Sequence, residues 1–234
     1  MRVAAVGDVH GREFLEPFKE RLAAVERPDL FLLAGDLTDH NRIGEFGEVV
    51  AAVKASAACP ILCVFGNNEW TTDHGAYRQR FDIIFLEDES RTFDVGGKSV
   101  RVIGSTGSLD EPTWWQRNNL SGIEREYEMC VRTLDRLLAG DGFRILLTHY
   151  PPTHATMGDE KPSWRPQLGS LRLEAVVLRR KPDLVIHGHV HKGIPFAELR
   201  AGPSTLEDFG DARQPVPVYN VAFPVTRAVT TIDI

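Results

Sequence analysis

The sequence is poor in cysteine and has no excess of basic charge. It holds 3 cysteines in 234 residues, and two of them, Cys59 and Cys63, lie in an apolar run. A small, odd number of cysteines excludes a disulfide framework and favours a reducing compartment. Lys and Arg number 27 against 33 Asp and Glu, a formal charge of −6. This balance argues against nucleic acid or anionic lipid as a partner, although bound divalent cations would reverse the field locally.

The sequence also lacks a long hydrophobic stretch. No apolar run reaches the roughly 18 residues that a membrane span needs. The opening segment, MRVAAVGDVHG, has too short an apolar core for a signal peptide. We therefore expect a cytoplasmic protein with no membrane partner. The 42% hydrophobic and 26% charged residues are typical of globular proteins, and no repeat or linker is visible, so we expect a single domain over residues 1–234.

The first third of the chain alternates short apolar runs with helical patterns. We expect strands at Val3–Val6, Leu30–Leu33 and Pro60–Phe65, and helices at Arg12–Arg27 and Ile43–Ala57. This alternation predicts a parallel sheet. Each of these strands ends at Gly-Asp or Gly-Asn. Because ligands bind at the carboxyl ends of strands in open α/β sheets, these loops should converge on one site.

The rest of the chain mixes β-type runs with two helical patterns, Ile123–Leu138 and Leu171–Arg180. Further strands are expected at Ile83–Leu86, Thr92–Val95, Ser99–Ile103, Phe143–Leu147, Asp183–Ile186, Ile194–Leu199, Val216–Val221 and Thr226–Ile232. Residues 104–122 and 153–169 show no periodicity and are predicted to be long loops. Loops of such length are commonly functional.

The two long loops carry aromatic and basic side chains. Their tryptophans would either stack on a ring of the substrate or close a small satellite core: Trp114, Trp115 and Trp164. Their basic residues would either contact a phosphate oxygen or be solvated: Arg117, Lys161 and Arg165.

Polar residues of metal-binding type stand where the expected strands end. They are Asp8, His10, Asp36, Asp39, Asn67, Asn68, Glu69, His149, His189 and His191. Imidazole suits Zn, Mn, Fe or Ni, and carboxylate or amide oxygen suits Mn or Mg. One ion rarely takes so many protein ligands, whereas two ions sharing a carboxylate would use them. Such a pair forms a clamp for in-line displacement at phosphorus.

Five short motifs in this order resemble those of the calcineurin-like metallophosphoesterases. They are GDVH at 7–10, GDLTD at 35–39, GNNE at 66–69, TH at 148–149 and GHVH at 188–191. Any one of them is weak, but five in order, each ending an expected strand, are specific. The resemblance implies an α/β fold, a four-layer α/β/β/α sandwich of two mixed sheets flanked by helices. It also implies two divalent metal ions, with Mn²⁺ favoured over Fe, Zn, Ni or Mg.

The resemblance assigns the metal ligands residue by residue. One ion would be bound by Asp8, His10 and His191, the other by Asn67, His149 and His189, and Asp36 would bridge the two. A hydroxide between the ions would be the nucleophile, because bound water can ionise near neutral pH.

One motif departs from the pattern of many members. Their third motif has a histidine near the leaving group where this chain has Asn68, while the acidic residue that would hold it, Asp39, is present. An amide cannot donate a proton as imidazolium does, and such donation is worth about 10²–10⁴-fold. Substrates with good leaving groups are therefore favoured, or another group supplies the proton. The candidates for that group are His40, His74 and His154.

The resemblance implies hydrolysis of a small phosphodiester, because members of the family that lack this histidine are often associated with phosphodiester substrates. The loop aromatics suggest a nucleotide-like one. The alternatives are a phosphomonoesterase and a non-catalytic scaffold that uses the same fold to bind protein. The candidate catalytic residues are Asp39, Asn68 and His149. The candidate substrate contacts are Asn68, Trp114, Arg117 and His154.

Overall fold

A computed structural model describes residues 1–200 and 214–234. Its strands form two mixed sheets. The first has the order β11-β1-β2-β3-β4, with bounds Thr230–Asp233, Arg2–Val6, Leu30–Leu33, Ile61–Cys63 and Ile84–Phe85. The second has the order β5-β6-β7-β8-β10-β9, with bounds Glu89–Val95, Lys98–Ser105, Phe143–Thr148, Leu184–His187, Val216–Asn220 and Phe196–Leu199.

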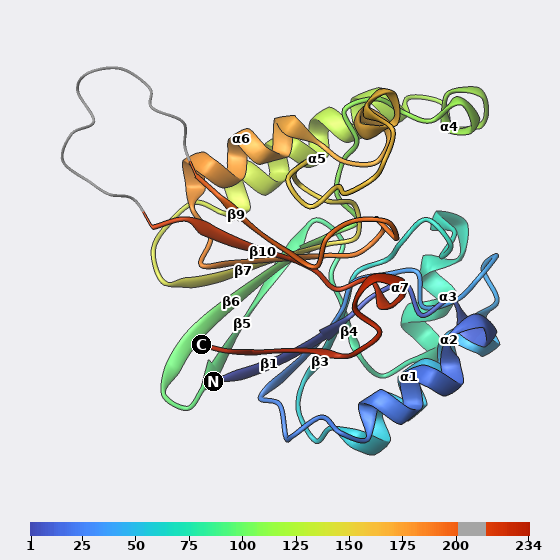
Figure 1. Cartoon of the computed structure of the whole chain (residues 1–234), viewed down its shortest axis with the longest axis vertical. Coiled ribbons are helices and arrows are strands. Elements are labelled where there is room, and N and C mark those ends of the chain that lie inside the picture. The colour runs from blue at the N-terminus through green and yellow to red at the C-terminus, as the bar shows by residue number, and fades with distance from the viewer. Residues whose placement is uncertain (201–213) are drawn as a thin grey trace.

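Helices cover the outer face of each sheet, as Figure 1 shows. Against the first sheet lie α1, α2 and α3, with bounds Leu15–Leu22, Ile43–Ser56 and His74–Arg80. Against the second lie α5 and α6, with bounds Ile123–Leu137 and Leu171–Arg180. The short helices are α4 at Trp114–Asn119 and α7 at Phe223–Thr226, with 3-10 turns at Gly11–Glu13, Thr71–Asp73 and Pro162–Gln167. The predicted α/β/β/α sandwich is confirmed.

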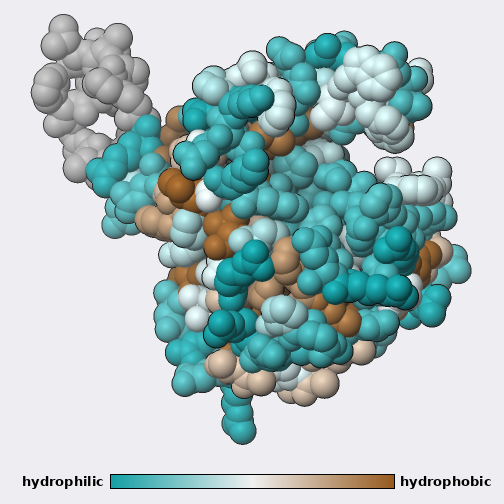
Figure 2. All heavy atoms as spheres, turned by 45° about the vertical axis from the view of Figure 1, so that its right-hand side comes forward, coloured by the Kyte–Doolittle hydropathy of each residue, from teal (hydrophilic) through white to brown (hydrophobic). Residues whose placement is uncertain are grey.

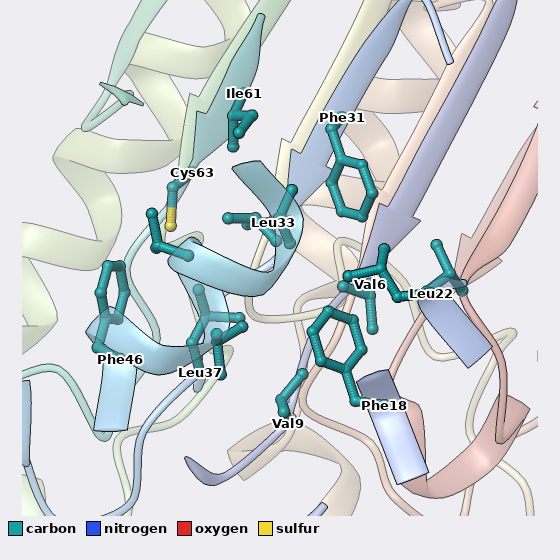
Figure 3. Packing of buried hydrophobic residues seen from close by; sticks show 14 of the residues in the cluster. Val6, Val9, Phe18, Leu22, Phe31, Leu33, Leu37, Phe46, Ile61 and Cys63 are labelled. Atoms are coloured by element: carbon teal, nitrogen blue, oxygen red, sulfur yellow. The ribbon is translucent and has the colours of Figure 1, made fainter. Parts of the chain in front are cut away.

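The layers follow from apolar strands that are buried on both faces. Along β1, Val3 and Ala5 pack between the two sheets, while Ala4 and Val6 pack against the helices. This division follows from the alternation of side chains along a strand. Figure 3 shows the helix side of the first sheet, where Phe18 lies near Val6, and Phe46 lies on the side of Leu37 and Cys63. Each strand's carboxyl end is thereby held rigidly, and the loops that follow inherit that position.

Several elements differ from those predicted. The helix expected over 12–27 is a 3-10 turn and then α1, which ends at Leu22. Pro28 disfavours helical backbone only at Arg27, so it does not account for the earlier end. The expected loop over 104–122 contains α4, begun by a capping box between Thr113 and Gln116. The expected loop over 153–169 contains the turn Pro162–Gln167. Helix α3 was not predicted, and the last strand begins at Thr230 rather than Thr226. Elements this short carry too little periodicity to detect.

In the two described stretches, no helix has both the length and the apolar character required to traverse a bilayer. The single-domain prediction for 1–234 includes residues 201–213, which lie outside the described part of the chain.

Candidate metal centre

The site lies where loops from both sheets meet at one edge of the sandwich. The loops after β1, β2 and β3 come from the first sheet, and those after β7 and β8 from the second. Figure 2 brings this edge toward the viewer and shows a largely hydrophilic surface, indented between its upper and lower parts. Nδ1 of His149, from the second sheet, is 2.9 Å from the carbonyl of Ala34, in the first. Donation to this carbonyl leaves Nε2 free as a ligand.

The first cluster joins Asp8, His10 and His191. Their ligand atoms all lie within 4.8 Å of one another. Nε2 of His191 is 3.0 Å from Oδ1 of Asp8 and 3.4 Å from Nε2 of His10. Asp8 is fully buried, whereas His10 and His191 are reachable from solvent. The structure therefore brings together the three residues predicted for the first ion.

The second cluster lies around Asp36 and His149. The ligand atoms of Asp8, Asp36 and His149 all lie within 4.8 Å of one another. Nε2 of His149 is 3.1 Å from Oδ1 of Asn67 and 3.7 Å from Oδ2 of Asp36. The ring of His189 lies 4.9 Å from that of His149, centroid to centroid. The predicted ligands of the second ion thus adjoin the first cluster through Asp8 and Asp36.

Burial sets the charge state of this centre. Burial, and next the negative charge of Asp8, raise the pKa of Asp36 to about 6. Burial would also raise the pKa of Asp8, but the hydrogen bond from His191 and the charges of His149 and His191 hold it below its usual value. Burial and the neighbouring imidazoles hold the pKa of His189 well below its usual value, so its ring is neutral. A neutral imidazole is the form that binds a metal.

Backbone conformation at the site is unusual. Asp8, His10, Asp36 and His189 all have positive φ, between 48° and 72°. Such backbone costs energy outside glycine and clusters at functional sites. Close packing adds to it, because a Cβ at Gly66 would collide with Asp36, and one at Gly188 would collide with Asp8. The glycines of the motifs let the loops approach this closely.

These residues fit two divalent cations. Asp8 and Asp36 are 0% and 2% exposed. In residues 1–200 and 214–234, the ion-pair partners of the two carboxylates are imidazoles, with no Lys or Arg among them. Burying two neighbouring carboxylates without a cation is costly. Mixed carboxylate, amide and imidazole donors suit Mn, Fe or Zn. When bound, the ions would polarise a phosphoryl oxygen and make a water more acidic.

Glu69 organises the site, a role that the sequence analysis did not assign to it. It is 2% exposed. Its Oε2 accepts hydrogen bonds from the backbone N–H of Asp36 at 2.9 Å and of Gly66 at 2.7 Å. Its Oε1 accepts from Leu37 at 2.8 Å and Thr38 at 3.2 Å. The available signal was an acidic residue directly after an amide pair at a strand end.

Asn68 and Asp39 lie beside the second cluster. The Asn68 amide Nδ2 donates to Oδ2 of Asp36 at 2.7 Å, and its backbone N–H donates to Oδ1 at 2.7 Å. Oδ2 of Asp39 lies 2.6 Å from Nδ1 of His40. Asp39 therefore holds a histidine next to itself in the chain.

The other two candidate proton donors are engaged elsewhere. His74 begins α3 rather than lying in a loop, is 7% exposed and stacks on Phe65 at 3.6 Å. Its Nδ1 faces Glu87 at 2.9 Å, and its Nε2 faces the carbonyl of Glu69 at 3.1 Å. Nε2 of His154 lies 3.4 Å from Oδ2 of Asp110. Whether His154 contacts substrate stays a prediction.

The loop tryptophans are exposed rather than packed in a satellite core. Trp114 and Trp115, on α4, are 76% and 58% exposed, and Trp164 is 51% exposed. Figure 1 shows α4 projecting from the rest of the upper layer. Arg117, also on α4, pairs with Glu111 at 3.3 Å. Substrate contact by Trp114 and Arg117 stays a prediction.

Comparison with known proteins agrees with this geometry. The family model of the calcineurin-like phosphoesterases matches residues 1–193. No curated protein sequence matches the chain significantly. Among solved structures, a phosphopantetheinyl hydrolase from Mycobacterium tuberculosis has a TM-score of 0.63 at 15% identity, over 94% of this chain and 88% of that chain.

Two further structures share the fold at similar distance. GAP50, the anchor in the inner membrane complex of Plasmodium, gives a TM-score of 0.58 at 16% identity, over 96% of this chain and 72% of that one. The purple acid phosphatase PPD1 from yellow lupin gives 0.55 at 17% identity, over 94% of this chain and 44% of that one. At these identities the likeness concerns the fold.

Proposed function

The chain belongs to the calcineurin-like phosphoesterase family, and we propose that it is a dimetal-dependent hydrolase of small phosphodiesters. The observation that carries the proposal is the juxtaposition of two buried carboxylates, Asp8 and Asp36, ringed by imidazoles from both sheets. Two neighbouring buried carboxylates call for cations, and two divalent cations bound there would clamp a phosphoryl group.

The protein's own residues would hold and orient the reacting groups. Asp8, His10 and His191 would hold one ion, Asn67, His149 and His189 the other, and Asp36 both. Glu69 fixes the loop that carries Asp36 through four backbone hydrogen bonds. The fixed geometry lowers the reorganisation that the transition state requires.

The preference for diesters is supported by Asn68. Its amide lies over Asp36, at 2.7 Å, and carries no ionisable proton. A diester has one negative charge fewer than a monoester dianion, so fewer cationic groups are needed to bind it. The exposed indoles of α4 support a substrate with an aromatic ring, such as a nucleotide-like ester.

The test is Mn²⁺-dependent hydrolysis of bis(4-nitrophenyl) phosphate beside 4-nitrophenyl phosphate. We expect faster release of nitrophenolate from the diester, and no release by Asp36→Asn. Faster cleavage of the monoester would make the protein a phosphomonoesterase. Failure to cleave either ester with Mn²⁺, Fe²⁺, Zn²⁺, Ni²⁺ or Mg²⁺ would favour a scaffold instead.

A further inference from the structure

The side chain nearest to the proposed bridging carboxylate cannot act as an acid. Nδ2 of Asn68 is 2.7 Å from Oδ2 of Asp36, and this amide does not ionise. An ester with an alkoxide or phenolate leaving group needs a proton as the bond to phosphorus breaks. Another group must reach the same place.

The backbone of His40 is hydrogen-bonded to the side chain of Asn68. Its N–H donates to Oδ1 of Asn68 at 3.2 Å, so the residue stands one hydrogen bond from the amide that lies over Asp36. The His40 side chain is 75% exposed. Its Nδ1 is 2.6 Å from Oδ2 of Asp39. This contact fixes the tautomer, so Nε2 faces away from Asp39, and the described residues offer it no hydrogen-bond partner.

The segment that carries His40 is strained and firmly held. His40 and Asn41 both have left-handed backbone, with φ of 48° and 58°. The N–H of Asn41 donates to the carbonyl of Asn68 at 2.8 Å. Its Oδ1 accepts from the N–H of Trp70 and from the hydroxyl of Tyr77, both at 3.0 Å. Two consecutive strained residues persist only where the surroundings impose them, which is typical of functional positions.

The alternatives are weaker on the same grounds. Both ring nitrogens of His74 face oxygen atoms, and the ring is buried. The His154 side chain is only 16% exposed, and among the described residues no hydrogen bond joins it to Asn68. The histidines of the two clusters are needed as ligands. His40 therefore combines proximity to Asn68, an orienting carboxylate and access to solvent.

We infer that His40 donates the proton to the leaving group and that Asp39 positions it, an inference that rests on the proposed function. In the step, the oxygen of a water forms a bond to phosphorus, and the bond from phosphorus to the leaving oxygen breaks. The electron pair of that bond stays on the leaving oxygen, which takes the proton from Nε2 of His40. The proton lost by the water passes to solvent, and solvent returns one to His40.

The test compares two esters that differ in the leaving group alone, methyl 4-nitrophenyl phosphate and methyl phenyl phosphate, with Mn²⁺. For His40→Ala we expect kcat/KM to fall by about 10²-fold or more for the phenyl ester, and by no more than about threefold for the nitrophenyl ester. Asp39→Ala should show the same selective loss, and Asp39→Asn a smaller one, because its amide oxygen still accepts from Nδ1. Mn²⁺ affinity by calorimetry should be unchanged in His40→Ala.

The outcomes separate the two proposals. An equal loss on both esters, or a loss on neither, overturns the role of His40 while the wild-type activity upholds the proposed function. If the wild type cleaves neither ester, the proposed function fails and this inference with it. A loss of Mn²⁺ affinity in His40→Ala would assign the residue to metal binding and contradict its role as proton donor.

Discussion

The carboxylate of Glu69 accepts a hydrogen bond from the backbone N–H of Asp36 at 2.9 Å, which ties the loop after β3 to the loop after β2. Since Glu69 is buried and accepts three more N–H groups, its side chain holds together the turn that presents Asp36.

Glu69→Gln should destabilise the fold and weaken the site. The glutamine side chain would place its NH₂ group where one carboxylate oxygen now accepts from two backbone N–H groups, so donors would face donors. Because a buried N–H left without its partner costs about 1–3 kcal/mol, we expect a loss on the order of 3 kcal/mol in the free energy of unfolding. Urea denaturation measures it. The control Glu16→Gln, at a side chain 77% exposed, should change by less than about 0.5 kcal/mol. A Glu69→Gln variant as stable as this control would contradict the assignment.

Asp36→Asn should abolish stabilisation by metal while leaving the fold intact. Metal that binds only the folded state adds about 2.7 kcal/mol to the free energy of unfolding at a metal concentration 100 times Kd. We expect this stabilisation to raise the Tm of the wild type when Mn²⁺ is titrated after chelation, and the Tm of the variant to rise little. Asp82→Asn, at a fully exposed side chain, should keep the full rise. Equal metal-induced shifts in both variants would exclude Asp36 as a ligand.

Asp110 should contribute stability that disappears in acid. Burial would raise its pKa, but the close contact with His154 and hydrogen bonds from the N–H groups of Leu171 and Arg172 and from Ser170 outweigh burial and lower it to about 2. Stability from this group is therefore complete above the unfolded pKa near 3.8 and is lost as pH falls through about 2. Asp110→Asn should lower the free energy of unfolding by about 2 kcal/mol at pH 7, and the difference from wild type should shrink toward pH 2. Urea denaturation at a series of pH values checks this, and a difference that does not vary with pH would refute it.

The tryptophans of α4 should affect substrate affinity without affecting stability. Trp114 and Trp115 are largely exposed, so replacing either with Ala should change the free energy of unfolding by no more than about 0.5 kcal/mol. If they stack on an aromatic ring, KM for bis(4-nitrophenyl) phosphate should rise at least about fivefold, the equivalent of about 1 kcal/mol. An unchanged KM would show that the two indoles do not touch the substrate.

Asn68→His should restore proton donation where it is missing. In the His40→Ala background, we expect it to accelerate cleavage of methyl phenyl phosphate by at least about tenfold, and that of methyl 4-nitrophenyl phosphate much less. Steady-state kinetics on the two esters provides the measurement. Acceleration of both esters by the same factor would mean that the substitution acts through something other than a proton.

The sequence predicted the parts of this structure that repeat a local pattern. Strands such as Leu30–Leu33 are apolar throughout because both faces are buried, and each ends at a glycine that permits close packing of the site loops. The seven residues predicted to bind metal were found from their places at strand ends and from the family motifs. The structure places them close together, and metal binding by them stays a prediction.

The features that were missed depend on contacts distant in sequence. The sequence marks Glu69 as an acidic residue at a strand end but does not show what it binds, because three of its four partners are backbone groups about thirty residues away. His74 was assigned to a loop, because the aromatic side chains that bury α3, such as Phe46 and Phe65, come from other segments. The exposure of Trp114 could not be foreseen either, because α4 has too few residues to show an apolar face.

The residues of the proposed metal centre come from two sheets that pack face to face, with Asp8 and Asp36 following strands of one and His149 and His191 following strands of the other. Ions bound there would cross-link the two sheets at this edge of the sandwich. Chelation would then free the sheets to open against each other before either one unravels, so amide exchange should quicken at the loop edge first. By the same reasoning, the rate at which activity returns during refolding would report when the two sheets pack together, rather than when each sheet forms.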